Sequence, residues 1–312
     1  MEKVIKAKGL IEQHIHGAYG VDFTVAKADE IVYLAEKLYQ DGISVFFPTL
    51  VTDSICNIKK QIAEIKRAKE IQPINSARIE GIHLEGPFIN PEKKGIHDVS
   101  LIQKPSIEVF KEIEDEIIKI VTIAPELDEN KNLTKYLYNK GIKVSIGHST
   151  STDFAFAHQA THLFNAMEGI SHRKKTTATE ALINDNVYTE VIADSIHICN
   201  EVLELIFRIK PKNKILLISD ALPIAHSDKA SMTFCSEQIY LQEGKATNAE
   251  GTIAGSAMLL PDIIKNIVKN DLLLLEDAVN MASTNISDYH GIENPVNITL
   301  SSDGSIVEVS RV

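Results

Sequence analysis

The sequence has no tryptophan and only three cysteines, Cys56, Cys199 and Cys235, among 312 residues. Three widely separated cysteines without a Cys-x-x-Cys pair argue against a disulfide framework and against a thiolate zinc site. We therefore expect a reducing, cytoplasmic location. The first residues lack an apolar core of signal-peptide length, and charges interrupt the later apolar runs before they reach membrane-spanning length. These features predict a protein with no membrane partner.

Positive charge is also scarce, because 43 acidic residues face 32 basic ones and the formal net charge is -11. Such a balance disfavours non-specific binding to nucleic acid or to anionic membranes, so we expect no nucleic-acid partner. An anionic substrate would need a local basic cluster. The run His172-Arg173-Lys174-Lys175 is one, although such runs are usually solvated loops.

Apolar runs of strand length alternate with helical periodicity along most of the chain. Eight expected strands cover residues 9–17, 44–50, 78–86, 120–126, 143–148, 160–165, 188–194 and 214–220. Helical spacing of apolar residues appears at 26–40, 53–69, 106–118, 130–139, 153–159, 177–184, 200–208, 257–269 and 275–282. This alternation predicts an α/β fold, a (β/α)8 TIM barrel closed by parallel strands.

The expected barrel occupies residues 9–285 as one domain. Near 232–252 the pattern changes to short alternating segments around Glu243-Gly244, which predicts a β-hairpin insertion. The end of the chain predicts a second hairpin about Asp303-Gly304. We assign residues 1–8 and 286–312 to a small, reduced accessory β segment.

Polar residues stand at the ends of several expected strands. The ends of strands one, three, five, six and eight carry His14 and His16, Glu85, His148, His162 and Asp220. Each alone could be a hydrogen-bonded core histidine or a helix-capping carboxylate. Because a barrel gathers its active groups at the carboxyl ends of its strands, six together predict a shared metal centre. Imidazole and carboxylate ligands suit a divalent metal such as Zn, Fe, Mn, Co or Ni.

Such a centre is suited to hydrolysis. A bound divalent ion polarises a carbonyl group and lowers the pKa of water, and a nearby carboxylate can take and return the proton. Asp220 is the candidate for this proton shuttle.

The order His-x-His, Glu, His, His and Asp resembles the amidohydrolase superfamily. More specific strings are His83-Leu84-Glu85-Gly86-Pro87-Phe88, Lys94-Gly95-Ile96-His97, Ala124-Pro125-Glu126, Gly147-His148-Ser149, Thr161-His162-Leu163-Phe164-Asn165-Ala166-Met167, Ala193-Asp194-Ser195-Ile196-His197, Ser219-Asp220-Ala221 and Gly251-Thr252-Ile253-Ala254-Gly255-Ser256. Together, over residues 9–285, they resemble the N-acetylglucosamine-6-phosphate deacetylase family. The resemblance implies a TIM barrel of the metal-dependent-hydrolase type.

The resemblance also implies the metal-binding residues. Glu85, His148 and His162 match the principal ligands, and Asp220 matches the catalytic acid and base. His14 and His16 match the family members that keep both first-strand histidines and can hold a second ion. One or two ions per subunit are therefore expected.

For the substrate, the resemblance implies a second set of residues. His97 matches a histidine that approaches the acetyl carbonyl and steadies its developing negative charge. Asn165 and Ala166 follow a metal ligand and could grip the sugar phosphate, and His197 matches a sugar-contacting histidine. Arg173 matches a phosphate-contacting arginine that can reach the neighbouring subunit's site, which implies a homodimer.

The expected activity is hydrolysis of N-acetylglucosamine 6-phosphate to glucosamine 6-phosphate and acetate, in amino-sugar catabolism. One alternative is a deacetylase of N-acetylgalactosamine 6-phosphate or another amidohydrolase, since an epimer changes no metal chemistry. A catalytically silent sugar-phosphate-binding protein is a third reading. The presence of Asp220 disfavours it, because a binder needs no proton shuttle.

Overall fold

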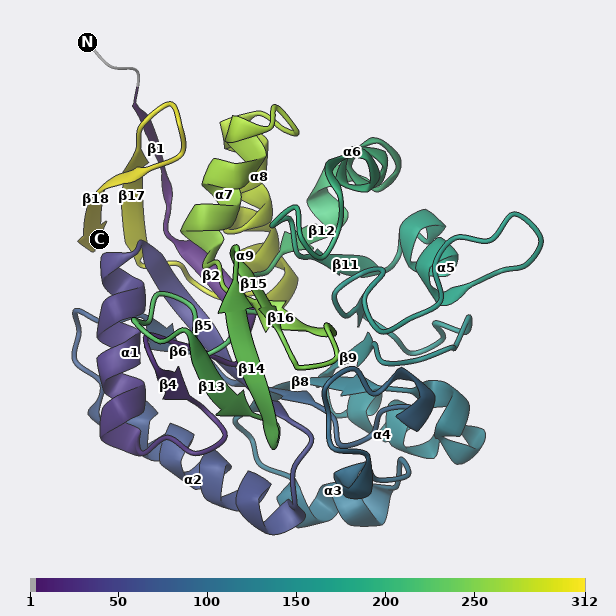
Figure 1. Cartoon of the computed structure of the whole chain (residues 1–312). Coiled ribbons are helices and arrows are strands. Elements are labelled where there is room, and N and C mark those ends of the chain that lie inside the picture. The colour runs from purple at the N-terminus through teal and green to yellow at the C-terminus, as the bar shows by residue number, and fades with distance from the viewer. Residues whose placement is uncertain (1–3, 312) are drawn as a thin grey trace.

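The computed structural model describes residues 4–311 and contains the parallel strands that the sequence predicts (Figure 1). Eight strands lie side by side in a curled parallel sheet, in the order β12-β11-β10-β9-β8-β7-β5-β2, and a short strand β6 (Arg78–Ile79) pairs with β5. Their bounds are β2 Leu10–Ile15, β5 Ile43–Val51, β7 Ile82–Glu85, β8 Ile118–Ile123, β9 Lys143–Ile146, β10 Gln159–Ala160, β11 Tyr188–Val191 and β12 Ile215–Leu217.

The two edges of this sheet meet just beyond the ends of β2 and β12. An isolated parallel bridge pairs Ile15 with Ala221. There the Asp220 N–H donates to the His14 carbonyl at 2.9 Å, and the His16 N–H donates to the Ala221 carbonyl at 2.9 Å. The backbone that closes the barrel is therefore the backbone that carries three predicted site residues.

Helices surround the barrel after most of its strands (Figure 1). They are α1 Ala28–Gln40, α2 Ile55–Ile71, α3 Ile107–Ile113, α4 Asn132–Asn139, α5 Thr177–Ile183, α6 Asn200–Ile209, α7 Leu260–Lys269, α8 Leu275–Met281 and α9 Thr284–His290. Among residues 4–311, no helix is both long enough and apolar enough to cross a membrane.

The helix predicted at 153–159 was wrong, because this segment forms turns. The Asp153 side chain accepts from the Ala155 N–H at 2.9 Å, and the Ser151 hydroxyl accepts from the Asp153 N–H at 3.1 Å. Phe156 has a φ of 69° in the left-handed region. These local hydrogen bonds compete with helical ones, so apolar spacing alone misjudged the segment.

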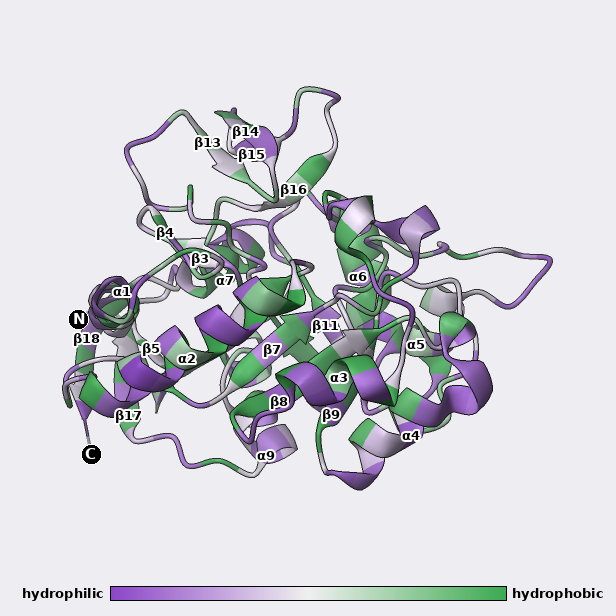
Figure 2. Cartoon of the chain, turned by 90° about the horizontal axis from the view of Figure 1, so that it is seen from below, coloured by the Kyte–Doolittle hydropathy of each residue, from purple (hydrophilic) through white to green (hydrophobic). Residues whose placement is uncertain are grey.

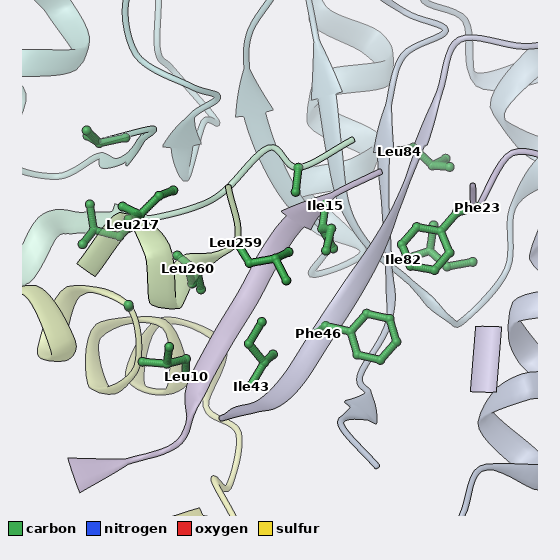
Figure 3. Close-up of a cluster of buried hydrophobic side chains, with 14 of the residues drawn as sticks. Leu10, Ile15, Phe23, Ile43, Phe46, Ile82, Leu84, Leu217, Leu259 and Leu260 are labelled. Carbon is green, nitrogen blue, oxygen red and sulfur yellow. The ribbon is translucent and has the colours of Figure 1, made fainter. Parts of the chain in front are cut away.

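The main hydrophobic core lies between the strands and the surrounding helices. Figure 3 shows Leu10 and Ile15 from β2 near Ile43 and Phe46 from β5. Leu259 and Leu260, at the start of α7, lie beside β2 in the same view and belong to this cluster. Their complete burial removes apolar surface from water at roughly 25 cal/mol per Å² and holds the sheet in its curl.

Inside the barrel, the alternate side chains form layers. The floor is apolar and contains Ile11, Val45, Phe47, Ile120 and Leu216, covered by Ile286 and Tyr289 of α9. Polar side chains such as Gln13, His83 and Glu190 lie above it, fully buried. The predicted division placed 286–312 in the accessory segment, whereas α9 packs against barrel strands.

The insertion after β12 is larger than the predicted hairpin. It contains four antiparallel strands in the order β13-β14-β15-β16, namely Ser231–Phe234, Glu237–Gln242, Lys245–Thr247 and Ile253–Ser256. Figure 2 shows β13, β14 and β15 standing beyond one end of the barrel strands. The end of β16 returns to the barrel through a bridge between Ser256 and Ala221.

A separate antiparallel sheet joins the two ends of the described chain. Its order is β1-β17-β18, with bounds Ile5–Lys8, Val296–Leu300 and Ile306–Arg311. β17 and β18 form the hairpin predicted about Asp303-Gly304, and Ile5 pairs with Leu300. Figure 1 shows this sheet beside α7 and away from the β13–β16 insertion.

Candidate metal centre and active site

The strand ends bring the six predicted metal-centre residues into one cluster. Glu85, at the end of β7, lies at its middle. Its Oε1 is 2.8 Å from His162 Nε2 and 3.2 Å from His148 Nε2, and its Oε2 is 3.3 Å from His16 Nε2. Asp220 Oδ1 is 3.0 Å from His16 Nε2 and 3.4 Å from His14 Nε2.

Two groups of three ligands share Glu85. One is His14, His16 and Glu85, and the other is Glu85, His148 and His162; within each group the ligand atoms lie within 4.8 Å of one another. A carboxylate has two oxygens, so Glu85 has a ligand atom for each group. The donor set is the nitrogen and oxygen set that divalent transition metals accept.

An unpaired buried nitrogen supports this fit. Among residues 4–311, His14 Nε2 is buried without a hydrogen-bond partner, although two carboxylates lie within 3.5 Å. A buried polar atom without a partner costs free energy unless something binds it. An ion held by Glu85, His14 and their neighbours would remove that cost.

The backbone at three of these positions is strained. The φ angles of His148, His162 and Asp220 are 47°, 26° and 53°, in the left-handed region that residues other than glycine rarely adopt. Each such residue costs on the order of 1–3 kcal/mol, and such residues cluster at functional sites. The turn after each strand therefore directs these side chains inward at a cost to stability.

The carboxylates and histidines set one another's charge. Burial raises the pKa of Asp220, but His14 and His16 lower it more, to about 2. Burial lowers the pKa of His16, while Asp220 and Glu85 raise it to about 9. The carboxylates therefore attract positive charge, and protons occupy His14 and His16 when no ion does.

His97 lies in the loop that follows β7, and its ring points toward Glu85. The Thr52 N–H donates to His97 Nδ1 at 3.2 Å, so the proton of the neutral ring is on Nε2, which lies 3.4 Å from Glu85. Burial lowers the pKa of His97 to about 4 despite this carboxylate. At neutral pH the ring is an uncharged hydrogen-bond donor at the edge of the cluster.

The cluster opens into a cavity of about 380 Å³. The barrel supplies its floor, and the insertion supplies Phe234, Thr252, Ile253 and Ala254 to its wall. The Phe234 ring lies 5.6 Å from the His16 ring, centroid to centroid. The insertion therefore covers part of the site and reduces its contact with water.

Three of the four other predicted substrate residues line this cavity, namely Asn165, Ala166 and His197. Asn165 donates to the His162 carbonyl at 3.3 Å, which places it directly above a ligand. Arg173 lies elsewhere. It is exposed in the loop before α5, where its Nε donates to His172 Nε2 at 3.0 Å, and Figure 1 shows that loop extending away from the barrel.

His197 is oriented by a buried carboxylate that sequence reasoning missed. Asp194 Oδ2 is 2.8 Å from His197 Nδ1, and the Ser256 hydroxyl donates to the same oxygen at 3.1 Å. Burial lowers the pKa of His197, but Asp194 raises it above its ordinary value. Asp194, which follows the seventh barrel strand β11, thus joins His197 to Ser256 at the end of the insertion.

Sequence reasoning also missed Thr52, Phe234 and Glu190. Glu190 had a signal, because an acidic residue inside the apolar strand Tyr188–Val191 needs buried partners. Thr52 and Phe234 had none, since nothing local distinguishes them from ordinary loop or strand residues.

Glu190 belongs to another group with ligand-like spacing, together with His14 and His83. In this group the nitrogens of His83 and the Nδ1 of His14 all have polar partners within the protein. His83 Nε2 is 2.8 Å from the Thr122 hydroxyl, and its Nδ1 is 3.3 Å from the Gln13 carbonyl. Burial lowers the pKa of His83 to about 3. His83 is therefore a neutral ring in a hydrogen-bond network below the cavity.

Comparison with known proteins agrees with this geometry. Residues 8–297 match the model of the amidohydrolase family. A Bacillus subtilis protein named N-acetylglucosamine-6-phosphate deacetylase is 31% identical over 97% of this chain and 80% of its own length. An Escherichia coli O157:H7 protein named N-acetylgalactosamine-6-phosphate deacetylase is 27% identical over 91% of this chain and 77% of its own length.

Solved structures agree as well. The crystal structure of N-acetylglucosamine-6-phosphate deacetylase from Thermotoga maritima has a TM-score of 0.90 and 25% identity, covering 99% of this chain and 88% of that one. The corresponding enzyme from Pasteurella multocida has a TM-score of 0.86 and 26% identity, covering 98% and 85%.

Proposed function

The chain belongs to the amidohydrolase family of metal-dependent hydrolases, and from this premise we propose that it deacetylates N-acetylglucosamine 6-phosphate, giving glucosamine 6-phosphate and acetate in amino-sugar catabolism. One observation carries the proposal: Glu85, His148, His162 and Asp220 converge at the floor of a single cavity. The relatives named for this reaction support the choice of substrate.

In this proposal Glu85, His148 and His162 hold a divalent ion, and His14 and His16 with Glu85 can hold a second. Zn, Fe, Mn, Co and Ni all suit these ligands. Such an ion, when bound, polarises the acetyl carbonyl and makes water a stronger nucleophile at neutral pH. Asp220, ionised at neutral pH, takes the proton of the attacking water and later delivers it to the leaving amine.

His97 supports the developing negative charge. The hydrogen bonds of Thr52 to Nδ1 leave the ring proton on Nε2, which lies 3.4 Å from Glu85 Oε2 at the cavity lining. A fixed neutral donor needs no reorganisation when the carbonyl oxygen becomes an oxyanion, which is the condition for effective electrostatic catalysis.

Asn165, Ala166 and His197 contact the sugar phosphate in this proposal, and all three line the cavity. Arg173 is proposed to bind the phosphate of the neighbouring subunit's substrate in a homodimer. Its exposed position outside its own cavity supports a role in trans. We further propose a cytoplasmic location from the cysteine usage.

The test is acetate release from N-acetylglucosamine 6-phosphate, from its unphosphorylated form and from N-acetylgalactosamine 6-phosphate. The metal content of the same purified sample is measured. We expect metal-dependent release that favours the phosphorylated glucosamine. Preference for the galactosamine epimer would transfer the assignment to the activity named for the Escherichia coli relative, and tight binding without release would indicate the silent binder.

A further inference from the structure

Glu190 lies one layer below the predicted ligands and is fully buried on β11. Both of its oxygens are used. Oε2 lies 3.0 Å from His14 Nδ1 and accepts from the His162 N–H at 3.3 Å. Oε1 accepts from Gln13 Nε2 at 2.6 Å and from Gln159 Nε2 at 2.8 Å. Three of these four partners can only donate, so an ionised carboxylate satisfies the set.

This arrangement determines the form of the His14 ring. A carboxylate only accepts, so His14 Nδ1 must carry a proton and donate it. In the neutral ring the lone pair is then on Nε2, the atom that points to Glu85 and Asp220 and has no hydrogen-bond partner within residues 4–311. The hydrogen bond to Glu190 thus leaves the lone pair of His14 on Nε2, the nitrogen that faces the other predicted ligands.

No other histidine of the centre has a carboxylate on Nδ1: that atom of His162 has no hydrogen-bond partner within residues 4–311, and those of His16 and His148 face backbone carbonyls. His16 Nδ1 lies 3.3 Å from the Thr49 carbonyl, and His148 Nδ1 lies 2.7 Å from the Lys93 carbonyl. Backbone carbonyls remain when side chains are replaced. His14 is therefore the ligand whose orientation one substitution can release.

We propose that Glu190 is a positioning residue that fixes the tautomer and orientation of His14, and thereby determines whether the His14, His16 and Glu85 group binds an ion. Glu190 contacts the Glu85, His148 and His162 group only through the His162 backbone N–H and none of its side-chain ligand atoms, so we expect that group to bind its ion with little dependence on Glu190. The inference rests on the proposed metal centre but not on the identity of the substrate.

The experiment is a Co²⁺ titration of chelator-treated wild-type protein and the Glu190→Gln variant, followed by absorption spectra and metal analysis. Glutamine keeps the size of the side chain but presents an amide to donors that need an acceptor. We expect wild-type protein to bind two Co²⁺ ions in two steps of the titration. In the variant, the affinity should fall by roughly 10–100-fold in only one of these binding steps, the loss that substitution of a residue behind a ligand usually causes. In assays, kcat should fall more than KM rises.

Two companion variants separate positioning from general packing. His14→Asn should weaken the same step, and Glu190→Gln should add nothing to it in the double variant, because both act through one ligand. Tyr289→Phe is the control, since its buried hydroxyl has no hydrogen-bond partner in the described chain. We expect it to bind metal as the wild type does.

Several outcomes would overturn the proposal: a wild-type protein that binds one ion, equal weakening of both steps in Glu190→Gln, or additive effects in the double variant. If Glu190→Gln does not fold, ¹⁵N NMR of Zn²⁺-loaded wild-type protein decides instead. A proton on His14 Nδ1 is expected, and a proton on Nε2 is the contrary result. The metal-binding and NMR readouts are independent of acetate release, so failure of the substrate assignment would leave them intact; only the kcat and KM comparison needs the substrate.

Discussion

At the residue scale, the proposed chemistry depends on a buried carboxylate that stays ionised. Asp220 is 7% exposed, and burial alone would favour its neutral form. The histidines beside it reverse that preference and lower its pKa to about 2. Asp220 is therefore ionised at neutral pH and able to accept a proton.

Asp220→Asn is predicted to remove most of the activity. Asparagine keeps the size of the side chain but cannot accept and return a proton, and such transfers contribute roughly 10²–10⁴-fold to rates. We expect kcat to fall by about that factor while the variant folds and retains metal. Acetate release and metal content are measured on one sample; a folded, metal-loaded variant with full turnover would contradict the assignment.

His97→Gln is predicted to lower kcat by roughly 10²-fold, the usual loss for one oxyanion donor, with a smaller change in KM. Thr52→Val is the informative companion because it removes the hydroxyl that holds His97 Nδ1 at 2.8 Å. We expect the kcat of Thr52→Val to lie between those of the wild type and His97→Gln. If steady-state kinetics instead show a raised KM with unchanged kcat in both variants, His97 has only a binding role.

In the metal-free protein, the stability contributed by His16 and Glu12 is predicted to fall as pH rises. The pKa of His16 is about 9 when folded, against an ordinary value of 6.5, so its contribution is complete below pH 6.5 and is lost towards pH 9. Glu12, whose pKa burial raises to about 8, acts in the same direction. The His16 shift corresponds to roughly 3 kcal/mol.

Urea unfolding of chelator-treated protein between pH 6 and 9 measures this loss. Zn²⁺-loaded protein should show a smaller fall, because a bound ion replaces the protons on the histidines while the Glu12 contribution remains. His16→Asn should have a flatter profile than the metal-free wild type. Identical profiles for the metal-free wild type and His16→Asn would be evidence against the pKa shift.

At the element scale, strand spacing in the barrel leaves little room beside the ligands. Gly147 lies between β9 and His148, and a Cβ atom there would be 2.5 Å from Thr161 Cβ and 3.0 Å from Thr122 Cγ2. Both threonines are β-branched and buried. The close approach of neighbouring strands therefore requires a glycine at this position.

Gly147→Ala is predicted to destabilise the protein by about 1–3 kcal/mol, as overpacking usually does. It should also lower metal affinity, since the backbone movement needed to fit the added Cβ atom would displace His148. Gly169→Ala is the matched control, because nothing lies within 4 Å of its added Cβ. Denaturant midpoints measure the difference, and equal midpoints for the two variants would mean that the strands move apart without cost.

At the scale of the whole molecule, one chain is proposed to complete the phosphate site of another. If Arg173 acts in trans, mixing Arg173→Glu protein with Asp220→Asn protein should restore activity that neither has alone. In each mixed dimer one site would contain both native residues, so about one quarter of all sites should recover under random exchange. Native mass spectrometry confirms the exchange, and mixed dimers without recovered activity would exclude the trans role.

Local sequence patterns were enough to predict much of the fold of this protein. Apolar runs of strand length and helical spacing predicted the parallel strands and most helices, and the barrel rule then placed Glu85, His148 and Asp220 at one end. This succeeded because a closed parallel barrel has one geometry, so strand order suffices to bring strand ends together. It also explains why residues that the structure brings into one cluster could be grouped without coordinates.

The tertiary structure alone decided the rest. Glu190 meets His14 across 176 positions of sequence, and the insertion reaches the cavity through Phe234. Arg173 proved to lie outside its own cavity, and the turn at Phe156 replaced a predicted helix. These features depend on which distant side chains are buried together and on whether local side-chain hydrogen bonds replace those of a helix. Periodicity along the chain contains no information about either.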